Sequence, residues 1–167
     1  IQPLSADELN SDSFFDGEQK PIPDGTILRC LVNGGFLGMR EGSSLMECHI
    51  YLTVTEQSEF TGQKYRYNCK AFDQNKDKRD RAMKHLSVID AQAGSPMAYG
   101  GIDLTTDAID EHWAGVSHVL VKFGAMVDEK DGKVINFVRG ISFDREKMLP
   151  PVTQQKKQQT QEQNIDF

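Results

Sequence analysis

The chain has 167 residues, of which 38% are apolar and 26% are charged, and its formal net charge is −6. This size and composition are typical of a globular protein with one domain and tails. No stretch approaches the roughly twenty consecutive apolar residues of a membrane-spanning helix, and no signal peptide opens the chain. We therefore expect neither membrane insertion nor secretion.

The three cysteines, Cys30, Cys48 and Cys69, cannot all pair with one another, and each falls within a strand-like run. Small buried thiols in a reducing compartment are the simplest interpretation, because cytoplasmic proteins rarely keep disulfides. We expect a cytoplasmic protein.

The first 20 residues form an acidic lead-in with little periodicity, and we expect the globular domain to span 21–149. Within it, Pro-Ile-Pro-Asp-Gly at 21–25 predicts a turn that opens a first strand over 26–32. Asn33-Gly34-Gly35 is expected to end this strand. The glycine-rich segment 34–42 is then interpreted as a mobile hairpin loop.

Residues 45–55 give the clearest strand pattern, because apolar side chains at 46, 48, 50, 52 and 54 alternate with His49, Tyr51 and other polar residues. A third strand is predicted over 64–72, with Tyr65, Tyr67 and Cys69 on one face. Short glycine-containing loops join the three strands, which favours an antiparallel meander.

A helix is predicted over 75–93, where Ala82, Leu86, Ile89 and Ala93 form one apolar stripe. Gly94 and Pro96 follow as a stop signal. We expect a loop at 99–101 and a short helix over 107–113. A fourth strand at 116–127, a hairpin turn at 128–132 and a fifth strand at 134–143 complete the domain.

This order of elements is that of an OB-fold, which is mostly β: a five-stranded antiparallel barrel with a helix between its third and fourth strands. Other small barrels would also accommodate five strands and one helix. An exposed edge could pair two copies into a homo-oligomer, although no residue pattern specifies such pairing.

Residues 150–167 are expected to form a disordered, Gln-rich tail, because they hold too little apolar surface to offset their ordering entropy. The tail ends in Ile165, Asp166 and Phe167. A flexible tether with an aromatic, acidic tip suits a docking peptide captured by a basic pocket on a partner. The alternative is a frayed terminus that happens to end in phenylalanine.

Charge is unevenly distributed along the chain. Residues 64–84 contain eight basic and three acidic residues, a net charge of +5, and the remaining 11 basic and 22 acidic residues give −11. One basic patch on an acidic protein is sufficient for local nucleic-acid binding. For 76–84 alone, a charged, solvated helix face is the favoured interpretation.

A single-strand-binding surface needs cations for phosphates and exposed aromatic rings for bases. Alternation on the first three strands places such residues on one sheet face: Arg29, Tyr51, Arg66, Lys70 and Phe72. A one-residue register change would instead expose Tyr65 and Tyr67.

Further candidates lie in the loop after the first strand and in the last two strands: Phe36, Arg40, Lys122 and Arg139. Phe137 shares a face with Arg139, and we interpret its ring as part of the core.

Over 21–145 the chain resembles phage single-stranded DNA-binding proteins with an OB-fold. The resemblance rests on Pro-Ile-Pro-Asp-Gly at 21–25, Phe-Thr-Gly-Gln-Lys at 60–64, the helix after the third strand, and Asn136 in the last hairpin. It implies DNA replication or recombination in the host cytoplasm, with the Phe167 tip recruiting partner enzymes. Family tails are acidic, whereas Glu162 and Asp166 are here balanced by Lys156 and Lys157.

No catalytic, metal-binding or cofactor-binding motif is present, and the four histidines are scattered. Cys48 and His49 are adjacent on a strand and so point to opposite faces, which excludes a shared metal. We expect a protein that binds single-stranded DNA, without enzymatic activity. The rival hypothesis is a protein-interaction module that docks on a host or phage polymerase, and an unrecognised nuclease is a more distant third.

Overall fold

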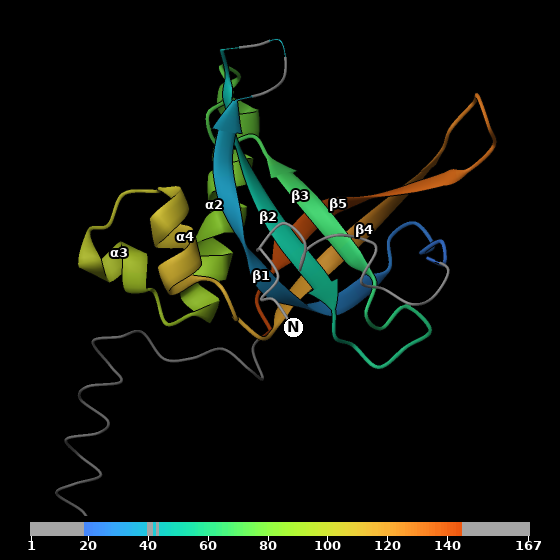
Figure 1. The fold of residues 1–167 in the computed structure, drawn as a ribbon, viewed down its shortest axis with the longest axis horizontal. Helices are drawn as coiled ribbons and strands as arrows, with labels where there is room; N and C mark the ends of the chain where they lie inside the picture. The colour runs from blue at the N-terminus through green and yellow to red at the C-terminus, as the bar shows by residue number, and fades with distance from the viewer. Residues whose placement is uncertain (1–18, 40–41, 43, 145–167) are drawn as a thin grey trace, which may run out of the picture.

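Five antiparallel strands form one sheet in the order β3-β2-β1-β4-β5 in this computed structural model, which describes residues 19–39, 42 and 44–144 (Figure 1). The acidic lead-in up to residue 18 and the whole tail with its tip lie outside the described residues. The elements are β1 (Ile27–Met39), β2 (Met46–Val54), β3 (Lys64–Cys69), α2 (Lys76–Gln92), α3 (Pro96–Gly100), α4 (Thr106–His112), β4 (Val119–Val127) and β5 (Val134–Ser142).

The expected mostly β class and the five antiparallel strands are confirmed, but the sheet is not closed. Within the described residues no backbone ladder joins the two edge strands, β3 and β5. β3 is also shorter than predicted: it ends at Cys69, and a turn in which Asp73 N donates to Lys70 O leads into α2.

β1 is longer than predicted, and the expected stop at Asn33-Gly34-Gly35 was wrong. The pairing with β2 shifts by one residue between Val32 and Gly34, and Gly34 adopts φ +125°, so a bulge lets the strand bend and continue. A Cβ at Gly35 would lie 2.2 Å from the carbonyl oxygen of His49, so the two backbones approach closely there. The segment 34–39 is therefore strand, and not the mobile loop that its glycines suggested.

The helix predicted over 75–93 is confirmed as α2. The Asn75 side chain accepts a hydrogen bond from Lys78 N at its start. The expected stripe faces the core, with Ala82, Leu86 and Ile89 at most 2% exposed. The helix packs against β5 and β4 on the side of the sheet that holds the core.

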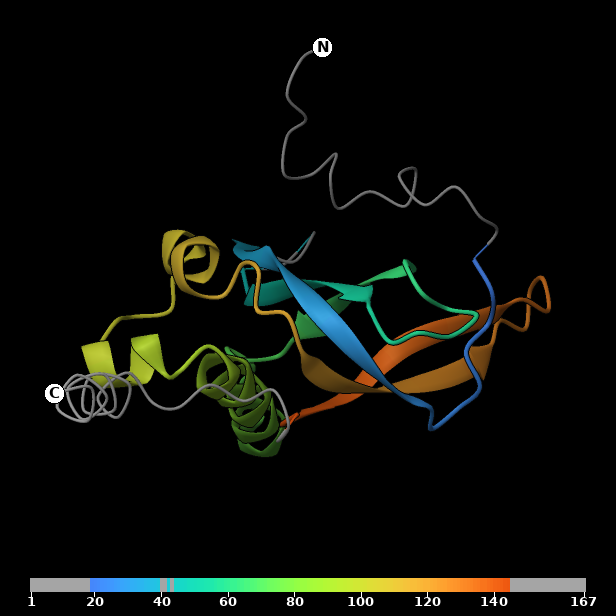
Figure 2. The same cartoon turned by 90° about the horizontal axis from the view of Figure 1, so that it is seen from below.

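Between α2 and β4 the structure contains α3, where the sequence suggested a loop, and α4, which was predicted. Both lie together at one end of the sheet, opposite the β4–β5 hairpin, as two perpendicular views show (Figures 1 and 2). The buried carboxylate of Asp90 holds this region together. It accepts hydrogen bonds from Met97 N, Ala98 N and the indole Nε1 of Trp113. Hydrogen bonds of this kind join residues from different elements, and no repeating pattern in the sequence predicts them.

The β4–β5 hairpin turns at 128–132, as predicted, where Gly132 N donates to Asp128 O. The side chain of Asn136 fixes this hairpin to the start of the domain. Its amide nitrogen donates to Ile22 O at 2.8 Å and its oxygen accepts from Ile22 N at 2.9 Å. Asn136 thus has a structural role, because it satisfies backbone groups that would otherwise be unpaired.

All three cysteines are buried and free. Cys48 and Cys69 face each other across β2 and β3. Burial raises the pKa of the Cys30 thiol to about 12, so this group stays protonated and behaves as a small apolar side chain. None of the helices described is long and apolar enough to cross a membrane.

Candidate nucleic-acid interface

One candidate surface is the outer face, defined here as Phe36, His49, Tyr51, Arg66 and Asn68 on β1, β2 and β3. Strand register aligns these residues in two rows. Tyr51 lies between Gly34 and Arg66, and His49 lies between Phe36 and Asn68. Directly opposed residues project to the same side of a sheet. Their neighbours Cys48, Ile50 and Leu52 are fully buried, so the predicted phase of β2 is confirmed.

The outer face carries a row of ring contacts. The Phe36 ring is stacked on His49, with centroids 4.6 Å apart and planes at 23°, and lies 5.9 Å from the Tyr51 ring. His49 is only 8% exposed, and its Nδ1 is 2.7 Å from the Asn68 side-chain oxygen. The buried imidazole of His49 therefore packs beneath the Phe36 ring, while the rings of Phe36 and Tyr51 remain half-exposed.

Positive charge on the outer face comes from Arg66, which is exposed beside Tyr51. No ion pair of Arg66 occurs within the described part of the chain. Lys70 lies just beyond the end of β3, and its ammonium pairs with the largely buried Glu47 carboxylate at 2.7 Å. Arg66 is thus the cation of this face whose charge is not offset locally.

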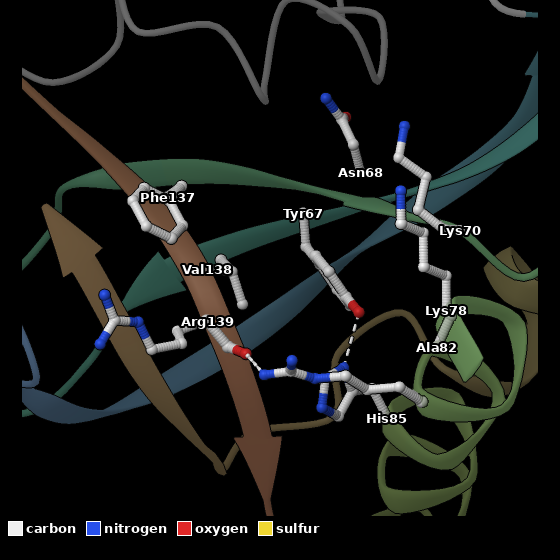
Figure 3. A pocket seen from close by; sticks show the side chains of 10 residues that line it. Tyr67, Asn68, Lys70, Lys78, Ala82, His85, Phe137, Val138 and Arg139 are labelled. Atoms are coloured by element: carbon white, nitrogen blue, oxygen red, sulfur yellow. Dashed lines mark hydrogen bonds between the residues drawn. The ribbon is translucent and has the colours of Figure 1, made fainter. Parts of the chain in front are cut away.

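A second feature is a groove of about 430 Å³ in the gap between β3, α2 and β5, where the sheet stays open (Figure 3). We call it the basic groove, because cations line it and no carboxylate is among its described lining. The lining consists of Tyr67, Asn68, Lys70, Lys78, Arg81, Ala82, His85, Phe137, Val138 and Arg139.

The floor of the basic groove is held by polar contacts between its walls. Tyr67 Oη lies 2.6 Å from His85 Nδ1, and Arg81 Nη2 donates to the backbone oxygen of Arg139 at 2.8 Å. Burial, together with the nearby charges of Arg81 and Lys84, lowers the pKa of His85. The imidazole is therefore neutral at neutral pH and suited to its hydrogen bond with the tyrosine.

Phe137 forms one side of this groove, and its interpretation as a core residue was wrong. The side chain is 38% exposed, and its ring lies over Gly124 of the paired strand, where a Cβ would be 2.3 Å from the ring. The Arg139 guanidinium lies 5.7 Å from the ring centroid and pairs with Asp24 at 2.8 Å. The absence of a side chain at Gly124 leaves room for the end of the aromatic ring beside the β4 backbone.

The predicted inward orientation of Tyr65 and Tyr67 is confirmed, so neither reaches the outer face. The Tyr65 ring packs 4.9 Å from the buried Phe123 ring, and its hydroxyl accepts from Gln63 Nε2 at 2.6 Å. Tyr67 faces His85 in the basic groove. The register in which these tyrosines would stack on bases is not the one observed.

The structure places Arg29 away from the other candidates. Its guanidinium donates to the buried Asp144 carboxylate at 2.6 Å and pairs with Glu56 at 3.1 Å, and these two contacts raise its pKa, with Asp144 the larger cause. Asp144 needs this cation as its partner inside the protein. We therefore assign Arg29 a structural role.

The remaining candidates are dispersed. Lys122 is exposed on β4 opposite Ile27, and Phe72 is 39% exposed in the turn between β3 and α2. Arg40 and the tip residues Ile165, Asp166 and Phe167 lie outside the described residues.

Two pairs of residues on these surfaces were not chosen as site candidates from the sequence. His49 and Asn68 alternate in phase with Tyr51 and Arg66, and this alternation could have placed them on the same face. Lys78 and Arg81 were instead interpreted as part of a solvated helix face.

In the described part of the chain no three His, Cys, Asp or Glu side chains lie close enough together to hold a metal ion. No protein-family model matches the chain, and no curated protein matches its sequence. The function is therefore inferred from the two surfaces themselves.

Proposed function

We propose that this protein binds single-stranded DNA, largely without sequence preference, through the outer face of β1, β2 and β3. The observation that carries the proposal is the ring row of Phe36, His49 and Tyr51 directly beside the exposed Arg66. Half-exposed rings provide stacking surfaces for bases, and a cation whose charge is not offset binds phosphates. Duplex DNA keeps its bases stacked internally and offers no such ring contact.

The fold supports the same proposal. The strand order β3-β2-β1-β4-β5, with α2 between β3 and β4, supports an OB-type architecture that is open between β3 and β5. OB-folds bind oligonucleotides on strands two and three. We propose an open OB-type barrel of the kind found in phage single-stranded DNA-binding proteins, acting in the host cytoplasm during replication or recombination. The tip at 165–167 is proposed to recruit partner proteins.

A titration of the full chain with a fluorescent thirty-base single strand tests this function. The same length of duplex and of RNA serve as comparisons, each at two salt concentrations. We expect the DNA single strand to bind at least about tenfold more tightly than the duplex, with affinity falling steeply as salt rises because counterions are released. Equal affinity for single strand and duplex, or no binding to either, would contradict the proposal.

A further inference from the structure

The first turns of α2 contribute cations to the basic groove. Lys78 and Arg81 are three residues apart and therefore lie on one side of the helix. The adjacent groove-lining residues on that side are Ala82 and His85. Figure 3 shows the Lys78 side chain beside that of Lys70, which comes from the end of β3. Cations from a helix and a strand end, distant in sequence, are thus brought to one wall.

The basic groove is continuous with the outer face. Asn68 belongs to the outer face through its contact with His49, and it also lines the groove next to Lys70. A bound single strand of DNA that runs across β2 and β3 therefore reaches the basic groove where it passes the edge strand β3. On the far side of the groove, the DNA meets the exposed Phe137 ring (Figure 3).

The charge balance of the groove favours a polyanion. Lys70 and Arg139 each pair with a carboxylate outside the lining, Glu47 and Asp24. Arg81 is exposed and donates a hydrogen bond to a neutral carbonyl. Lys78 is exposed and makes no ion pair within the described part of the chain. Two cations are therefore not offset there by a carboxylate, and they lie at one groove with an aromatic ring.

The geometry points to a second section of the nucleic-acid site. The phosphodiester backbone of the bound single strand enters the basic groove, Lys78 and Arg81 bind its phosphates, and a base packs against the exposed edge of the Phe137 ring. This inference rests on the proposed function for the class of ligand. It adds helix α2 and the hairpin face of β5 to the surface formed by β1, β2 and β3.

The test compares Lys78→Ala with Lys76→Ala in the full chain. Lys76 precedes Lys78 by two residues, about 200° around the helix axis, and does not line the groove. For a thirty-base single strand we expect Lys78→Ala to weaken binding about fivefold at 0.1 M salt and to reduce the slope of log affinity against log salt by about 0.7, the value for one phosphate contact on single strands. Lys76→Ala should leave both unchanged, and Lys78→Arg should retain them.

Strand length separates this inference from the proposed function. A strand shortened until it covers only the outer face should bind wild type and Lys78→Ala equally, because it no longer reaches the groove. If the wild type binds single strands but Lys78→Ala and Lys76→Ala behave alike at every length, the groove inference is wrong and the outer face stands. If the wild type does not bind single strands, the proposed function itself fails.

Discussion

Phe36→Ala is expected to weaken single-strand binding by one to two orders of magnitude. The Phe36 ring stacks on His49 at 4.6 Å and borders Tyr51 at 5.9 Å, so its removal disrupts the whole ring row. Base–aromatic stacking contributes about 1–3 kcal/mol per base, and each 1.4 kcal/mol corresponds to about tenfold in affinity. Fluorescence anisotropy with a thirty-base single strand measures the change directly.

Two controls make this result specific to the outer face. Phe36→Tyr keeps a ring at the position and should bind within a few-fold of the wild type. Tyr99→Ala removes a ring that is 61% exposed on α3, a helix whose main contacts are with α2 and α4. We expect no loss of affinity from it. If Phe36→Ala folds and binds like the wild type, bases do not stack on this row.

Gly35→Ala is expected to destabilise the folded protein by about 3 kcal/mol or more. The added methyl group would lie 2.2 Å from the His49 carbonyl oxygen and 3.1 Å from Ile50 Cδ1, so β1 and β2 would have to separate. A domain of this size is stable by only about 5–15 kcal/mol, so this is a large fraction. Urea denaturation followed by the fluorescence of the single, buried Trp113 reports the change.

Gly132→Ala is the matched control for this stability change. Gly132 has φ +72° and no atom within 4 Å of an added Cβ, so only backbone strain of about 1 kcal/mol is expected. A Gly35→Ala protein as stable as Gly132→Ala would mean that β1 does not pass so close to His49. The register that brings Phe36 onto His49 would then be incorrect, and the ring row with it.

The alternation of residues in β2 and β3 was sufficient to predict the inward tyrosines and the outward Tyr51 and Arg66. Side-chain period fixes the face of a strand wherever one side is buried. Helix α2 was equally predictable from its apolar stripe and from the stop signal at Gly94 and Pro96. The face of a strand residue and the apolar side of a helix are both set by residues a few positions apart, so they can be predicted from the sequence of one segment.

Features that depend on tertiary contacts were not predictable. The glycines at 34 and 35 are typical of a turn, yet here they allow a bulge and a close backbone approach within a continuing strand. The apolar character of Phe137 predicted burial, and its ring is instead 38% exposed because Gly124 on the neighbouring strand leaves room for it on the hairpin surface. The basic groove is lined by residues of α2, β3 and β5. Because these elements are distant in sequence, no single segment of the sequence predicts the groove.

Ultraviolet crosslinking of a bromodeoxyuridine-substituted thirty-base strand, with the adducts mapped by mass spectrometry, locates the bound bases on the protein. Base stacking on the outer face requires adducts on the β1 and β2 peptides that contain Phe36 and Tyr51, and these adducts should disappear when unlabelled single strand is added in excess. Adducts confined to α3 and α4, or none at saturating protein, would show that bases do not contact the ring row and would contradict single-strand binding by the outer face.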